Sequence, residues 1–113
     1  MKFSELNDKE LLQAVKPLAD HTEASWNNKS YGDFCHYLSE QFPEDEFNRQ
    51  LEDSYDKLGA HTLTDLVAIH RNPENVIAIW KVDFEKRKDQ GLLMYCFIEV
   101  EGKPLIAGCT YHS

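Results

Sequence analysis

Asp65 is the first side chain whose type and position could do chemistry. It alternates with Leu63, Val67 and Ile69, so it faces the interior if these residues form the inner side of a strand. A carboxylate held among apolar side chains can act as a general base. If the other set of alternate residues faces inward, Asp65 is a surface charge, the commoner environment for an aspartate. The sequence leaves both orientations open.

Aromatic side chains with polar tips could line a pocket around such a carboxylate, because each offers an apolar body and a hydrogen-bonding group. The candidates are Trp26, Tyr31, Tyr55, Trp80 and Tyr111. Packing in the core or at its rim is the commoner role for each of them. Small or medium side chains at positions 105, 107 and 109 alternate with Tyr111 and could leave space for a cavity.

The cysteines and histidines predict neither a metal site nor a nucleophile. The five histidines lack the paired spacing of metal ligands, and no phosphate-binding glycine loop indicates a cofactor. Cys35 and His36 are neighbours on a predicted helix and therefore point in different directions. Cys96 and Cys109 are expected on adjoining strands and on the same face, as free thiols. Three cysteines, an odd number, favour a reducing compartment.

The charge distribution argues against nucleic-acid binding. The formal net charge is −8, of which residues 1–60 carry −7 and residues 61–113 carry −1. An acidic surface repels phosphate backbones. No segment has the length and hydropathy of a membrane span, and the first residues do not resemble a secretory signal. We therefore expect a cytoplasmic protein without a membrane partner.

The first half of the chain predicts three helices. Asn7 begins a capping-box pattern for the first helix, and Pro17 should kink or restart it. Asp33 can cap a short second helix. Pro43 opens a third, which Gly59 ends.

The second half changes to a period of two. Four strands are expected, at about 62–70, 76–85, 91–100 and 104–112. Short turns join them, so they should form an antiparallel meander. Three helices followed by a curved four-stranded sheet predict an α+β fold in one domain spanning residues 1–113.

The third strand is apolar on both faces, which raises the question of what covers the second face. We expect alternate residues to face the helices, namely Leu92, Met94, Cys96, Ile98 and Val100. Leu93, Tyr95 and Phe97 should then point outward. An exposed apolar patch of this kind on a monomer is rare without a use. A second copy pairing sheet to sheet is the preferred explanation, and a helix or loop of the same chain is the alternative. The dimer-face candidates are Ile77, Ile79, Leu93, Tyr95, Phe97 and Ile106.

The order of the predicted helices and strands can be compared with that of known folds. The end of the first helix and the second helix lie in "SWNNKSYGDFCHYLSEQF", and the third helix is "PEDEFNRQLEDSYDKLG". The meander begins with "TLTDLVAI" and "VIAIWKVDFE". Over nearly its full length the chain resembles the nuclear transport factor 2-like, or ketosteroid-isomerase-like, α+β superfamily. A short strand often found before the third helix is missing. The resemblance implies a bent sheet around the helices, a pocket at the wide end and dimerisation through the sheet.

This fold hosts isomerases, dehydratases, ligand binders and interaction modules, so it does not determine activity. We expect a non-catalytic, homodimeric domain that binds a small apolar molecule or a protein. One alternative is an isomerase or dehydratase that uses Asp65 with a tyrosine donor. Another is an acidic docking module for a basic protein.

Overall fold

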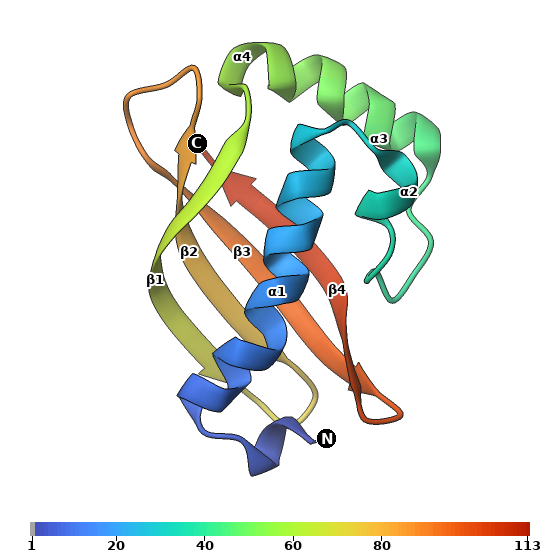
Figure 1. The fold of residues 1–113 in the computed structure, drawn as a ribbon, viewed down its shortest axis with the longest axis vertical. Helices are drawn as coiled ribbons and strands as arrows, with labels where there is room; N and C mark the ends of the chain where they lie inside the picture. Colours follow the sequence, from blue (N-terminus) through green and yellow to red (C-terminus); the bar gives the residue numbers. More distant parts are fainter. Residues whose placement is uncertain (1) are drawn as a thin grey trace.

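Helices occupy the first half of the chain and strands the second (Figure 1), in a computed structural model that describes residues 2–113. The helical elements are η1 (Phe3–Glu5), α1 (Asp8–Asn27), α2 (Tyr31–Phe34), α3 (Glu44–Gln50), η2 (Leu51–Tyr55) and α4 (Asp56–Leu58). The strands are β1 (His61–Arg71), β2 (Val76–Phe84), β3 (Gly91–Val100) and β4 (Lys103–His112). The predicted α+β class and order of elements are confirmed.

Helix α1 begins with the predicted capping box. The backbone N–H of Glu10 donates to the Asn7 side chain at 2.8 Å, and the N–H of Asn7 donates to the Glu10 carboxylate at 3.0 Å. The helix then runs through Pro17 as one element of 20 residues, so Pro17 does not restart it. Figure 1 shows α1 lying across one face of the sheet. Its buried side chains, among them Leu11, Val15 and Trp26, close the core on that side.

The third predicted helix is one continuous helical segment made of α3, η2 and α4. Its middle part, η2, is a π-helical turn, a widening that is frequent near functional sites. Phe47 and Leu58 are its buried apolar anchors. Gly59 ends the segment with a φ of 75°, a left-handed value that glycine adopts without a side-chain penalty.

The strands form one antiparallel sheet in the order β1-β2-β3-β4. Their observed bounds agree with the predicted ranges to within one residue at each end. Within residues 2–113 no helix is long and apolar enough to cross a membrane.

The predicted orientation of β3 is wrong. Leu93, Tyr95 and Phe97 are 2%, 0% and 0% exposed, so they face the helices. Directly paired residues of neighbouring strands share a face, and Leu93 pairs with the inward Trp80 of β2. Phe97 pairs with Ile106, which is also buried and not on the outer face. Tyr95 and Phe97 face inward because aromatic side chains bury a larger apolar area than the aliphatic side chains on the other face of β3.

The other side of β3 forms the outer face of the sheet. The sheet register places six apolar side chains there, which we call the outer patch: Ile77, Ile79, Leu92, Met94, Cys96 and Ile98. Leu92 is 41% exposed, and the other five are half-buried. The prediction that both faces of β3 are apolar is therefore correct, although the two faces were exchanged.

Cys96 and Cys109 do not share a face. Cys96 pairs with Gly108 on the outer side, whereas Cys109 pairs with the buried Tyr95 on the inner side. The register of β4 also shifts between the partners of Cys96 and Phe97, leaving Ala107 unpaired. This bulge turns Ile106 inward, so the simple alternation assumed from position 105 to position 111 fails.

Candidate functional site

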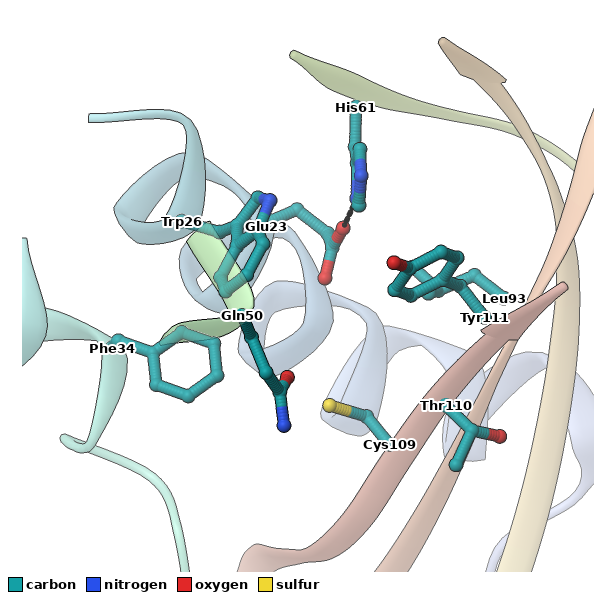
Figure 2. A pocket seen from close by; sticks show the side chains of 9 residues that line it. All are labelled: Glu23, Trp26, Phe34, Gln50, His61, Leu93, Cys109, Thr110 and Tyr111. Carbon is teal, nitrogen blue, oxygen red and sulfur yellow. Dashed lines mark hydrogen bonds and ion pairs between the residues drawn. The ribbon is translucent and has the colours of Figure 1, made fainter. Parts of the chain in front are cut away.

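A small cavity lies between α1, the starts of β1 and β3 and the end of β4 (Figure 2). We call it the inner cavity, and its volume is about 50 Å³. Its walls are Glu23, Trp26, Phe34, Gln50, His61, Leu93, Cys109, Thr110 and Tyr111. A cavity of this size holds a few water molecules or the end group of a small ligand.

Glu23 is the charged centre of the inner cavity. Helix α1 carries it on the face that packs against the sheet, where it is only 7% exposed. Nδ1 of His61 lies 2.8 Å from Glu23 Oε1, and the Tyr95 hydroxyl donates a hydrogen bond to Glu23 Oε2. A buried carboxylate is strongly unfavourable unless such partners replace water. Helix, first strand and third strand therefore meet in one polar network inside the core.

His61 is positioned by its backbone as well as by its ring. Its N–H donates to Asn27 Oδ1, and its carbonyl accepts from Asn27 Nδ2, both at 2.8 Å. The Tyr55 hydroxyl donates to the carbonyl of the same Asn27 at 3.2 Å. The last residue of α1 thereby holds the first residue of β1. We call this pair of amide hydrogen bonds the Asn27 clamp.

The clamp and the carboxylate together orient the His61 imidazole. A carboxylate oxygen can only accept a hydrogen bond, so Nδ1–H of His61 donates to Glu23. Nε2 is then left for another partner. It is buried and has no hydrogen-bond partner among residues 2–113.

Trp26 supplies a second buried group without a partner. Its indole Nε1–H makes no hydrogen bond within the described chain, residues 2–113. The Trp26 and His61 rings lie 6.0 Å apart between centroids, and both border the inner cavity. Figure 2 shows the indole nitrogen on the side of Trp26 that is turned toward Glu23 and His61. Buried polar groups are nearly always paired, so two unpaired groups at one cavity indicate a place for water or a ligand.

The electrostatics of the site keep its hydroxyl and thiol neutral. Burial, and then the negative charge of Glu23, raise the pKa of Tyr95 well above its usual value of 10.0. The same two causes raise the pKa of Cys109 from 9.0 to about 12. Tyr95 is therefore a permanent donor to Glu23 at neutral pH. Cys109 is an unreactive thiol, because the thiolate is the nucleophilic form.

The structure separates the aromatic candidates. Trp26 and Tyr111 line the inner cavity, and Figure 2 shows the Tyr111 hydroxyl pointing toward Glu23. Trp80 is a core residue, 1% exposed, packed edge-to-face against Tyr95. Tyr31 donates its hydroxyl hydrogen bond to the Phe42 carbonyl, and Tyr55 donates to Asn27 as described. These last three are not among the side chains of the inner cavity.

Asp65 lies outside the inner cavity. It is exposed on β1, where the pairing with β2 is irregular between Leu63 and Leu66. The inward orientation is therefore contradicted, and the surface-charge alternative agrees with the structure. Two register shifts in β1 broke the alternation on which the inward orientation depended.

Glu23 and His61 were missed by the sequence interpretation. A signal for Glu23 was present, because it lies four residues after Ala19 and three before Trp26 on the apolar face of α1. A lone acid on that face predicts a buried carboxylate that needs partners. His61 gave a weaker signal, since it precedes the first strand by one residue in the predicted ranges. Among residues 2–113 no cluster of three or more potential ligands could hold a metal ion.

Comparisons with known proteins place the fold but not the activity. No protein-family model and no curated protein matches the chain. An NTF-2 like protein of unknown function from Shewanella oneidensis superposes with a TM-score of 0.62 at 12% identity, covering 89% of this chain and 98% of that one. A designed NTF2 protein gives 0.61 at 13% identity, over 87% and 96% of the two chains.

Bd1075 of Bdellovibrio bacteriovorus is also similar, with a TM-score of 0.56 at 13% identity. The match covers 98% of this chain but 42% of Bd1075. Identities this low show the fold alone. The chain thus has an NTF2-like α+β fold, and its chemistry has to be argued from the inner cavity.

Proposed function

We propose that this domain binds a small molecule in the inner cavity. The observation that carries the proposal is the pair of buried, unpartnered groups, Trp26 Nε1–H and His61 Nε2, beside a cavity. Each such group destabilises the folded protein by about 1–3 kcal/mol unless something bonds to it. A ligand that bonds to both recovers that free energy as affinity.

The polar network supports binding by holding the His61 imidazole in place. Tyr95 and His61 both contact Glu23, and the Asn27 clamp orients the His61 backbone. A site built on packed helices and strands loses little entropy when its ligand arrives.

Two matched substitutions test the proposal. Cys109→Met fills the inner cavity, whereas Cys96→Met makes the same change on the outer face. We expect ligand-observed NMR of a fragment library to find binders of the natural protein that Cys96→Met retains and Cys109→Met loses. A library with no binder sensitive to Cys109→Met would overturn the proposal.

A second candidate function is catalysis of the isomerase or dehydratase type, with His61, oriented by Glu23, in the proton-transferring role first considered for Asp65. It is favoured by the contact of 2.8 Å between Glu23 and His61, because a carboxylate-oriented imidazole can move protons. The Tyr111 hydroxyl would be the donor to a developing oxyanion. The test is turnover of candidate ketones and hydroxy-ketones by the natural protein and by Glu23→Gln. Turnover unaffected by Glu23→Gln would remove this candidate.

We also propose that the protein forms a homodimer through the outer patch. The centre of this patch carries apolar side chains without charges, the composition typical of interface cores. The helices contact the other face of the sheet, so they leave this one for a second copy (Figure 1). Sedimentation velocity should give a dimer for the natural protein and a monomer for Met94→Lys. A monomeric natural protein would contradict this arrangement.

The three cysteines are free, which supports the proposed reducing, cytoplasmic location.

A further inference from the structure

A second cavity adjoins the first and is larger. We call it the outer cavity; its volume is about 280 Å³. Its walls are Phe34, Leu38, Glu40, Gln41, Phe42, Gln50, Ile106, Ala107, Gly108 and Cys109. Three of these side chains, Phe34, Gln50 and Cys109, also line the inner cavity. The two cavities are therefore separated by a shared wall.

One wall of the outer cavity is held by backbone hydrogen bonds. The chain after α2 joins β4 there, because Ile106 N–H donates to the Tyr37 carbonyl and Ser39 N–H donates to the Ile106 carbonyl, both at 2.8 Å. This short parallel pairing fixes Leu38 against Ile106. Phe42 packs edge-to-face on Phe34 at 5.9 Å between ring centroids. Leu38, Phe42 and Ile106 thus form an apolar part of the wall suited to a hydrocarbon tail, and Glu40 and Gln41 form a polar part.

Gln50 is the movable part of the shared wall. Its side chain is exposed, and its Nε2 is held by one hydrogen bond of 3.0 Å to Glu46. Figure 2 shows its amide between Phe34 and Cys109. Breaking one exposed hydrogen bond costs little, so Gln50 can rotate and open its part of the shared wall.

The two unpartnered groups define the polar end of the ligand. Trp26 Nε1–H needs an acceptor, and neutral His61 needs a donor at Nε2. A hydroxyl group meets both needs at once, because its oxygen accepts while its O–H donates. If His61 becomes protonated, the same oxygen can accept from both groups. The hydroxyl therefore fits the site in either state of the imidazole.

Other common end groups fit less well. A ketone oxygen accepts from Trp26 and can accept from a protonated His61, but it leaves neutral His61 without a donor, whereas a hydroxyl serves both states. An ammonium group donates but leaves the indole N–H unpaired. A carboxylate would be repelled by Glu23 in a region of low dielectric.

We propose that the ligand is an alcohol with an apolar tail, its hydroxyl between Trp26 and His61 and its tail past Gln50 into the outer cavity. This inference rests on the proposed binding function and names the class of ligand for the same site. Water is the competitor for the polar position, since a buried water also donates and accepts.

The first test follows the indole N–H signals by proton–nitrogen NMR during titration. Four probes share one tail length: hexan-1-ol, hexan-2-one, hexan-1-amine and hexanoic acid. We expect hexan-1-ol to bind about tenfold more tightly than the others and to shift the Trp26 indole signal. Trp26→Phe should remove this preference, whereas Trp80→Phe, the same change in the core beyond the inner cavity, should keep it.

The second test follows the tail and does not depend on Trp26. Across butan-1-ol, pentan-1-ol and hexan-1-ol, affinity should rise about fourfold for each methylene group that is buried. Phe42→Ala should weaken this dependence on length. Leu92→Ala, an apolar truncation on the outer patch, should leave it unchanged.

The outcomes separate the ligand class from the binding function. If another probe binds more tightly than hexan-1-ol and loses affinity in Cys109→Met, the alcohol class is overturned and the binding function stands. If none of the four probes binds but other fragments depend on Cys109, the alcohol class again fails alone. If no fragment binds at all, the binding function fails and this inference fails with it.

Discussion

The two faces of β3 carry a similar load of apolar side chains but meet different surroundings. On the inner face Leu93, Tyr95 and Phe97 are covered by helices, and the Tyr95 hydroxyl contacts a buried carboxylate. On the outer face Met94 and Cys96 are half-buried, and helix α1 lies on the opposite side of the sheet. Apolar content alone therefore does not identify the core face of a strand. The inner face is distinguished by its aromatic rings and by the polar network they enclose.

The largest effect should come from truncating one side chain on each face. Phe97→Ala removes a fully buried ring and should lower the free energy of unfolding by about 3–5 kcal/mol. Met94→Ala on the outer patch should lower it by less than about 1 kcal/mol in the monomer. Urea denaturation at low protein concentration measures both. Similar losses for the two variants would mean that the faces are equally buried in solution.

The next effect comes from removing the centre of the polar network. Glu23→Leu leaves the Tyr95 hydroxyl and His61 Nδ1 without their acceptor, so the free energy of unfolding should fall by about 2 kcal/mol. Glu10→Leu, an acid on the same helix but exposed, is the control, and its loss should be that of one helix cap, about 1 kcal/mol or less. Thermal and urea unfolding can compare them. A stabilised Glu23→Leu variant would show that the network was retained for a reason other than stability.

Alkaline pH should destabilise the inner face. The folded-state pKa values of Tyr95 and Cys109 lie above their ordinary values, so the unfolded chain loses protons first. The stability that these neutral groups contribute is complete below about pH 9 and is lost as pH rises from 9.0 toward about 12 for Cys109. For Tyr95 the loss begins near its ordinary value of 10.0.

Urea midpoints measured from pH 7 to pH 11 test this dependence. Cys109→Ala should flatten the decline that starts near pH 9, and Tyr95→Phe the part that starts near pH 10. Cys96→Ala on the outer face is the matched control. The pKa of Cys96 is also raised by burial, but Glu23 is not among its causes, so its variant should change the decline less. An equal change in both cysteine variants would contradict the difference between the faces.

The smallest effect is expected for Asp65→Asn. Asp65 is exposed and lies outside the inner cavity, so the free energy of unfolding should change by less than about 0.5 kcal/mol and ligand affinity should not change. A binding assay with any cavity ligand checks this. A large loss of affinity would return Asp65 to the list of candidate functional residues.

The sequence predicted the elements well because their signals are local. The Asn7 capping box, the stop at Gly59 and the turns between strands each depend on a few neighbouring residues. The orientation of β3 was not predictable in the same way, because a strand that is apolar on both faces has no alternation to read. Only its pairing with Trp80 and Ala78 of β2 decides the matter.

The candidate site was harder to predict than the fold. The site joins residues from three elements, because His61 and Tyr95 lie 38 and 72 residues after Glu23 in the sequence. No local sequence pattern connects them. The acid on the apolar face of α1 was the one readable sign. Its partners could be found only after the start of β1 and the inner face of β3 were placed against the helix.

The Asn27 clamp has a consequence for how this chain can vary in length. It joins residues 34 apart in sequence, so the segment between them, including α2 and the α3–η2–α4 helix, is a closed excursion that leaves and returns at one point. Doubling the length of such an excursion adds only about 0.6 kcal/mol of closure entropy if it is flexible. Lys29 and Glu40 are exposed, so insertions near them should leave the Glu23–His61 pair in place. Such insertions would change the helical segment that lines the inner cavity. The clamp holds the two ends of this segment together, so changes in its loops alter the cavity walls that Phe34 and Gln50 supply before they reach the Glu23–His61 pair.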